Sequence, residues 1–352
     1  MPIQMWETAD LLAVANPEQR TRPSDFWRSL FPGRHYSEKQ KIIFDDIPAP
    51  DYRMAPFVLP NVQGRVMRLR GSGVKDFAPA YVKPKHVIDP TMSIPRMPGE
   101  TILGSLSLEE RFNRIVAQTA VLQSDYIDNR MEWLCCQAAT MGEVTIAGED
   151  YPSVTVNFQR NALLTNVLTG AATWDNATTA DPAANFNLMR QRAFELGKSP
   201  IRRHVFGLDA WNAWSRLESS KKLLDNMNRG SNTSFNGTGY REGSFFEYQG
   251  TISGPNGGGQ LEMWTYSNQY EDSDGQMKDF LDPRDVVGIG ANMQGYQCFG
   301  AILDRKQGLT ATDKFPKMWD EEDPSVTYTM TQSAPLAVPM NPNATYRMRV
   351  LP

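Results

Sequence analysis

The sequence predicts an α+β fold that is organised around one long helix. Three observations lead to this prediction. The stretch 108–141 contains neither proline nor glycine, strand-like runs alternate with single helical patterns in the rest of the chain, and no internal repeat occurs. Hydrophobic residues make up 40% and charged residues 22% of the 352 positions, which is the balance of a globular protein.

The composition argues against several classes of protein. The formal net charge is −4, whereas a nucleic-acid-binding domain is usually strongly basic. No run of about 18 apolar residues occurs, so we expect no membrane partner, and the first residues lack the order of a secretory signal. Cys135, Cys136 and Cys298 fit neither a disulfide framework nor a zinc site, which favours a reducing cytosol.

The first 105 residues are predicted to lack a core of their own. Residues 1–48 hold short amphipathic pieces broken by prolines, and we expect them to form an arm. In residues 49–105, proline-rich strand-like runs flank a Gly-Ser-Gly break at 71–73, the pattern of a long extended hairpin. Between 61 and 96, seven Lys and Arg residues stand against two Asp residues. A projecting basic hairpin of this kind needs a partner surface.

The next element is the long helix. Ser107 and Glu110 form a capping box, and Gly142 supplies a stop signal at the other end. At a rise of 1.5 Å per residue, a helix over 108–141 is roughly 50 Å long, enough to act as a strut.

The remaining elements follow in order. The segment 143–160 is predicted to form a strand, a turn and a strand. Asp181 is the expected N-cap of a helix that runs to about Leu196, and Asp209 that of a helix over 209–227. We expect a buried strand at 204–209, a loop at 228–259, a hairpin at 260–281, and strands at 285–291, 297–303, 323–339 and 345–350.

No catalytic, metal or cofactor motif is convincing. His35, His86 and His204 lack metal-binding spacing, and His86 with Asp89 would offer only two ligands. The stretch 270–276 lacks the acids of an EF-hand and is predicted to form a hairpin turn. The glycines of 286–295 are wrongly spaced for a dinucleotide site and precede a strand-like run. We therefore predict that the chain is not an enzyme and binds no cofactor.

Six stretches, in the same order along the chain, resemble the major capsid proteins of tailed bacteriophages. The resemblance is to the lambda-like branch, the phage major capsid protein E family. The stretches are RGSGVKDFAPAYVKPKH (70–86), YPSVTV (151–156), VFGLDAWNAW (205–214), LDNMNRGSN (224–232), DKFPKMW (313–319) and TYTMTQSAPL (327–336).

This resemblance implies the tailed-phage major capsid fold, with an N-terminal arm, an extended β-hairpin loop, a long spine helix, and peripheral and axial domains. It assigns the spine helix 108–141 to the peripheral domain. The implied ranges are 1–48 for the arm, 49–105 for the extended loop, 106–179 for the peripheral domain, 180–302 for the axial domain and 303–352 for strands that return to the peripheral domain.

The resemblance also implies a function and partners. The chain would self-assemble into the hexamers and pentamers of an icosahedral head that encloses double-stranded DNA without sequence-specific binding. It would be made in the host bacterial cytoplasm and end in the virion capsid. A separate scaffolding protein, a portal and a decoration protein are the further partners expected. Decoration is favoured over covalent cross-linking, for which Lys75, Lys83 and Lys85 would be the donors.

The stretch 77–90 is then expected to be one limb of the loop that lies over a neighbouring subunit. The residues expected at such contacts are Arg65, Arg68, Arg70, Lys75, Lys83, Lys85 and His86, opposite Asp320, Glu321, Glu322 and Asp323. The alternative is a soluble nucleic-acid-binding or scaffold-type module that uses the basic hairpin 61–96. Its few aromatic residues, Phe77 and Tyr81, offer little for base stacking.

Overall fold

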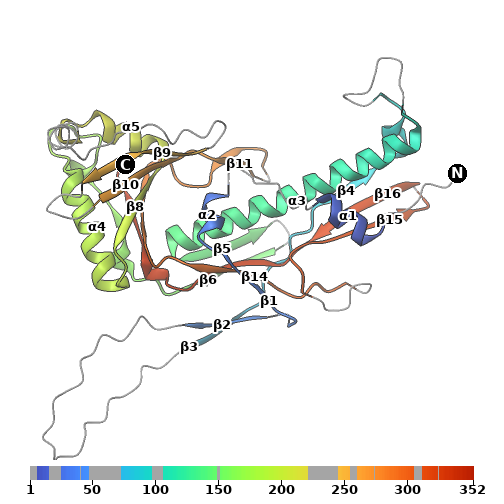
Figure 1. Ribbon diagram of the computed structural model, residues 1–352, viewed down its shortest axis with the longest axis horizontal. Coiled ribbons are helices and arrows are strands. Elements are labelled where there is room, and N and C mark those ends of the chain that lie inside the picture. The colour runs from blue at the N-terminus through green and yellow to red at the C-terminus, as the bar shows by residue number, and fades with distance from the viewer. Residues whose placement is uncertain are drawn as a thin grey trace, which may run out of the picture.

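The fold is an elongated α+β body with one helix along its length (Figure 1). The structure is a computed structural model. It describes residues 6–15, 25–39, 41–46, 73–96, 106–148, 151–220, 245–253, 260–272, 274–304, 311–323 and 325–352. Helix α3 (Leu108–Met141) runs through the body, and separate sheets pack at its two ends and along its middle. The predicted α+β class is confirmed.

Local signals set both ends of α3 as predicted. The Ser107 hydroxyl accepts a hydrogen bond from the Glu110 backbone N–H, and the Glu110 carboxylate accepts one from the Ser107 N–H at 2.7 Å. Gly142 ends the helix with a left-handed φ of 70°. A side chain there would also collide with Arg160, so glycine is required twice over.

A six-stranded mixed sheet covers the C-terminal end of α3. Its order is β7 (Thr165–Val167), β18 (Thr345–Arg349), β13 (Asp285–Gly290), β8 (Ile201–Phe206), β10 (Gln260–Tyr266) and β9 (Phe246–Ser253). Helices α4 (Pro182–Gly197) and α5 (Leu208–Arg216) pack near it, as do the 3₁₀ turns η2 (Ala162–Leu164), η3 (Gly170–Ala172) and η5 (Pro342–Ala344). The Asp181 side chain caps α4 as predicted.

Two three-stranded sheets lie along the rest of the helix. The first has the order β15 (Phe315–Glu321), β16 (Val326–Gln332) and β4 (Lys85–Ile88), near α1 (Thr8–Ala15) and the turn η1 (Pro90–Ser93). The second has the order β1 (Gly33–Tyr36), β14 (Gly295–Phe299) and β17 (Pro335–Pro339), next to α2 (Phe26–Ser29).

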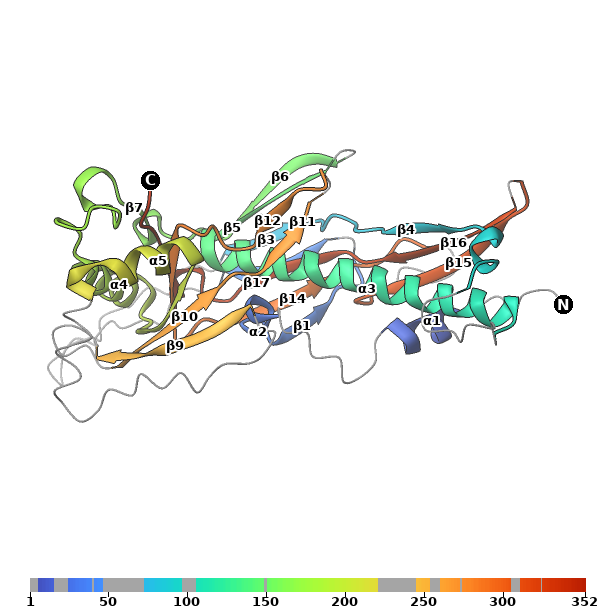
Figure 2. The same cartoon turned by 90° about the horizontal axis from the view of Figure 1, so that it is seen from above.

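Three two-stranded ribbons complete the part of the fold that the structure describes. These are β2 (Ile42–Asp46) with β3 (Gly73–Phe77), β5 (Glu143–Gly148) with β6 (Tyr151–Asn157), and β11 (Gln269–Glu271) with β12 (Met277–Asp279). The β2–β3 ribbon lies off the body in Figure 1, and the β5–β6 ribbon points away from α3 in Figure 2. The predicted turn at 270–276 is confirmed as the turn that joins β11 to β12.

Several predicted elements differ from the structure. The expected loop over 228–259 contains strand β9, which pairs with β10. The expected helix over 209–227 begins after Gly207 and is interrupted at Leu217, whose backbone is extended and whose side chain is buried. The expected hairpin over 260–281 contributes its first limb, β10, to the large sheet. The expected strand over 323–339 divides around Ser333 and Ala334, because its two halves join different sheets.

The described parts of residues 1–105 pack largely on their own subunit, and our expectation for them is wrong in this respect. Leu11 of α1 is buried against α3, and Trp27 and Phe31 are fully buried in the central core. The run 82–88 pairs with β16 and Ser333 of the same chain, so it is not a free limb. Each proline-bounded piece is too short to form a core alone. It instead buries its apolar side chains against α3 and the sheets.

Candidate functional site

One sheet brings together most of the described residues that were expected at subunit contacts. Lys85 and His86 lie on β4, and Asp320 and Glu321 lie at the end of β15, with β16 between them. Lys75 lies on β3, opposite Phe44. Arg65, Arg68 and Arg70 lie outside the described residues.

The basic end of this sheet rests on aromatic rings. The Lys85 ammonium lies 3.7 Å from the centroid of the Tyr328 ring and 5.2 Å from that of Trp319, and these two rings stack on each other. Lys83 lies 4.9 Å from the ring of Tyr81. Such cation–π contacts hold an ammonium in place while its outer side stays solvated. Within the described residues, neither lysine forms an ion pair.

The acidic end is the turn between β15 and β16. Asp320, Glu321, Glu322 and Asp323 are all exposed there. The Thr327 hydroxyl donates a hydrogen bond to Asp320 at 2.6 Å, which steadies the first carboxylate. This turn carries a cluster of negative charge without a cation from the described part of its own chain.

His86 points the other way, toward α3. Its ring stacks on Tyr126 at a centroid distance of 6.0 Å, and its Nδ1 lies 3.0 Å from the Gln123 amide nitrogen. Gln123 is buried and also donates to the carbonyl of Thr329 and accepts from the hydroxyl of Thr331. His86 therefore helps to join β4 to the helix rather than face solvent.

Neither of the other two histidines lies in a metal-binding cluster. His35 is exposed on β1, and His204 is fully buried on β8, where burial lowers the pKa of its imidazole to about 3. In the part of the chain that the structure describes, no group of three His, Cys, Asp or Glu side chains could hold a metal ion. Residues 295–299, after the glycines of 286–295, form a strand, so the helix of a dinucleotide site is absent there.

Asp128 of α3 joins two segments that are distant in the sequence. Its carboxylate lies 3.0 Å from an Arg28 guanidinium nitrogen and 2.9 Å from the Lys314 ammonium. Lys314 also donates to the Ser124 hydroxyl at 2.6 Å. Arg28 belongs to the N-terminal segment and Lys314 to the run before β15, so one carboxylate on the helix fixes both.

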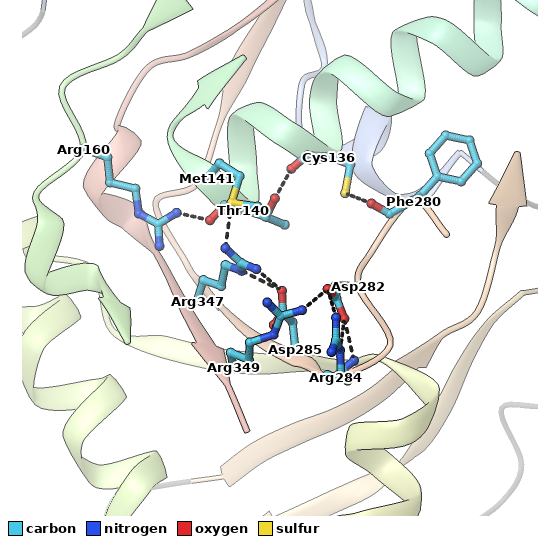
Figure 3. A network of polar contacts seen from close by, with 10 residues as sticks. All are labelled: Cys136, Thr140, Met141, Arg160, Phe280, Asp282, Arg284, Asp285, Arg347 and Arg349. Carbon is cyan, nitrogen blue, oxygen red and sulfur yellow. Dashed lines mark hydrogen bonds and ion pairs between the residues drawn. The ribbon is translucent and has the colours of Figure 1, made fainter. Parts of the chain in front are cut away.

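A second polar network joins the helix end to the six-stranded sheet (Figure 3). Asp285 begins β13, and Arg347 and Arg349 lie on the neighbouring strand β18. A nitrogen of Arg347 lies 2.6 Å from the Asp285 carboxylate, whose side chain is only 2% exposed. Arg349 and Arg284 both pair with Asp282 beside it. Burial raises the pKa of Asp285, and Arg347 opposes this rise.

Arg160 completes the C-terminal end of the spine. Its guanidinium donates to the carbonyls of Thr140 and Leu164, and the first of these is one of the helix carbonyls that have no partner within the helix (Figure 3). Burial lowers the pKa of Arg160 to about 10, so the group is charged at neutral pH. A cation at this position also opposes the negative end of the helix dipole.

Nearly the whole chain matches one protein family. The model of the family described as phage major capsid protein E matches residues 7–350. The chain belongs to the phage major capsid protein E family.

Known members and one solved structure agree with this membership. The major capsid protein of Escherichia phage N15 is 30% identical to the chain over 97% of it and 98% of the relative. That of Escherichia phage lambda is 29% identical over the same shares. The crystal structure of a putative capsid protein of a prophage of E. coli CFT073 has a TM-score of 0.74 at 23% identity, covering 99% of each chain.

The chain is therefore a structural protein of a phage capsid. The phage capsid fold expected from the resemblance is confirmed, and the alternative of a soluble nucleic-acid-binding module is not favoured. Within the described residues, no helix combines the length and the apolar character that crossing a bilayer requires. In a capsid protein, the groups that matter are those that hold the subunit together and those that meet its neighbours.

Proposed function

We propose that the chain builds an icosahedral phage head as hexamers and pentamers that enclose double-stranded DNA. Membership of the capsid family over almost the entire chain supports this proposal. The peripheral domain would comprise 106–179 and 303–352, the axial domain 180–302, and the segments 1–48 and 49–105 the arm and the extended loop. The work of the subunit is assembly rather than chemistry, through contacts repeated around each symmetry axis.

The observation that carries the contact proposal is a pair of opposite charge clusters at one sheet, neither of which forms an ion pair with another residue that the structure describes. On the central strand β16, Lys85 of β4 pairs with Met330, whereas Glu321 of β15 pairs with Val326. The Lys85 ammonium lies over the rings of Tyr328 and Trp319, and within the described residues it forms no ion pair with the acidic turn. Lys83 and Lys85 of one copy would therefore meet the acidic turn 320–323 of a neighbouring copy.

Further partners follow from the same proposal. A scaffolding protein would guide assembly in the host bacterial cytoplasm, a portal would occupy one vertex, and a decoration protein would reinforce the shell. The net charge of −4 suits a shell that encloses DNA without binding it tightly.

The test is a charge reversal with rescue. In the double variant Lys83→Glu, Lys85→Glu, we expect the yield of sedimenting shells to fall at least about tenfold, because like charges then face each other across a repeated contact. The subunit itself should lose no more than about 2 kcal/mol, because each of the two exposed lysines gives up cation–π contacts worth about 0.5–1 kcal/mol. Shells are counted by electron microscopy of the sedimented fraction, and subunit stability is measured by urea unfolding.

Two comparisons make this test specific. Changing Asp320, Glu321, Glu322 and Asp323 to lysine in the double variant should restore assembly. Lys39→Glu, on an exposed turn after β1, controls for a Lys→Glu reversal away from the proposed contact and should assemble normally. Normal shell yield in the double variant would refute the proposed contact while leaving family membership intact.

A further inference from the structure

A groove runs beside helix α4, at one end of the body (Figures 1 and 2). Its volume is about 360 Å³, and it is lined by Asn187, Arg190, Gln191, Phe194, Pro200 and Ile201. The ring of Phe194 is 60% exposed. Arg190 and Phe194 are four residues apart on α4, so their side chains lie on the same face of the helix. The groove therefore offers an exposed aromatic ring next to a cation.

The chain around this groove is basic. Between 187 and 203, five Lys and Arg residues stand against one carboxylate, that of Glu195. The amide of Gln191 donates to Glu195 at 2.9 Å, so this carboxylate has a partner on its own helix. Among the residues that the structure describes, Arg190 forms no ion pair. The groove is therefore suited to an apolar side chain that has a negative charge beside it.

The β11–β12 ribbon has the complementary features. Met277 on β12 is 61% exposed. It lies directly opposite Glu271 on β11, which is also exposed, and directly opposite residues of an antiparallel pair lie on the same face. The run 269–279 contains four carboxylates and one cation, that of Lys278. The ribbon thus presents an apolar side chain beside a carboxylate.

The ribbon is held firmly on the body. The ring of Tyr270 packs on that of Phe280, which is buried in the central core, at a centroid distance of 4.9 Å. Its turn is closed by a hydrogen bond of 2.9 Å from the Gly275 N–H to the Asp272 carbonyl. Lys278 forms an ion pair with Asp272, so the cation of the ribbon is neutralised within it. The exposed side chains are therefore presented in a fixed arrangement.

We propose that the β11–β12 ribbon of one copy docks into the α4 groove of a neighbouring copy. Met277 lies against Phe194, and Glu271 forms an ion pair with Arg190. The spacings match, because residues four apart on a helix have Cβ atoms about 5–6 Å apart and opposite residues of an antiparallel pair about 4.5–5.5 Å apart. A thioether also packs well against an aromatic ring.

The occupant of the groove is a second copy rather than the same chain. In both views α4 lies at one end of the body and the β11–β12 ribbon nearer its middle, so one subunit cannot join them (Figures 1 and 2). Two different surfaces that meet head to tail close into a ring when the contact is repeated around an axis. This contact rests on the proposed hexamers and pentamers, and both of its surfaces lie within the proposed axial domain, 180–302.

A charge exchange in the full-length chain tests the contact. Glu271→Arg and Arg190→Glu should each lower the yield of sedimenting shells at least about tenfold, because like charges then meet at every contact around the axis. The two changes together should restore the yield. Asp175→Arg, at an exposed carboxylate outside both surfaces, should assemble normally. Normal yields from both single variants would overturn the contact, whereas no shells from the unmodified chain would overturn the proposed function itself.

Cross-linking tests the same contact without changing its charges. In shells of the double variant Met277→Cys, Phe194→Cys, a short bis-maleimide should give covalent products with the masses of pentamers and hexamers on a denaturing gel. The three native cysteines are buried and should not react. The matched control is Met277→Cys, Leu163→Cys, because Leu163 is 55% exposed but lies outside the groove. Shells of the first variant that link no more than those of the control would overturn the docking.

Discussion

Replacing Asp285 with alanine is expected to destabilise the subunit by about 3–5 kcal/mol, the cost of removing one partner from a buried ion pair. Asp285 is the buried carboxylate of the network that joins the end of α3 to the large sheet (Figure 3). In the variant, the largely buried guanidinium of Arg347 keeps its positive charge but loses its partner, the Asp285 carboxylate 2.6 Å away. Urea unfolding of the unassembled chain measures the loss as a lower midpoint at an unchanged slope.

Asp282→Ala is the matched control for this substitution. Asp282 pairs with Arg284 and Arg349 in the same network, but its side chain is 28% exposed. Because water can solvate the arginines that it leaves, the loss should be about 1 kcal/mol or less. Equal losses at the two positions would show that burial of Asp285 does not determine its contribution.

Replacing Trp27 with alanine should cost a similar amount, about 3–5 kcal/mol, because it leaves a large cavity in the central core. The indole is fully buried and lies edge-on to Phe26 and Tyr266, at centroid distances of 5.0 and 5.7 Å. We expect the loss to undock residues 25–31 first, which brief proteolysis followed by mass spectrometry detects as new cleavage within this segment.

Phe194→Ala is the control for the second substitution, since Phe194 is a 60% exposed aromatic residue on α4. Its replacement should change the unfolding free energy by no more than about 0.5 kcal/mol. If Trp27→Ala is as mild, the N-terminal segment is not part of the core of its own subunit. The original expectation of a detached arm would then regain support.

Elements whose signals are local were predictable from the sequence. The ends of α3 depend on Ser107, Glu110 and Gly142, which act within one turn of the helix. The start of α4 depends in the same way on Asp181. Helix α5 shows the limit of such signals, because its sequence pattern continues past Leu217 without a stop signal, whereas the helix ends there.

The polar groups that hold the subunit together were missed, since their partners are distant in sequence. Arg28 and Lys314 meet on Asp128 only after the chain has folded, and neither has a local pattern. The sequence does carry one signal for the network around Asp285. Arg347 and Arg349 alternate with fully buried residues along β18, so both arginines lie on one face of a strand that needs an acidic partner.

The role of the expected contact residues stays a prediction, and the structure shows where the described ones lie. Lys83, Lys85 and the acidic turn 320–323 are exposed on one sheet, as a role in subunit contacts requires. His86 contacts Gln123 and Tyr126 of its own chain, because the alternation of side chains along β4 turns it toward α3. The arm was misjudged because each of its pieces was weighed alone, without the surfaces that α3 and the sheets provide.

Electron microscopy of the full-length chain, expressed with and without the proposed scaffolding protein, tests the capsid account most directly. We predict closed shells of hexamers and pentamers in which Lys83 and Lys85 of each copy lie against residues 320–323 of a neighbour, while residues 25–31 stay within their own subunit. A chain that remains monomeric under both conditions would contradict its role as a shell-building subunit.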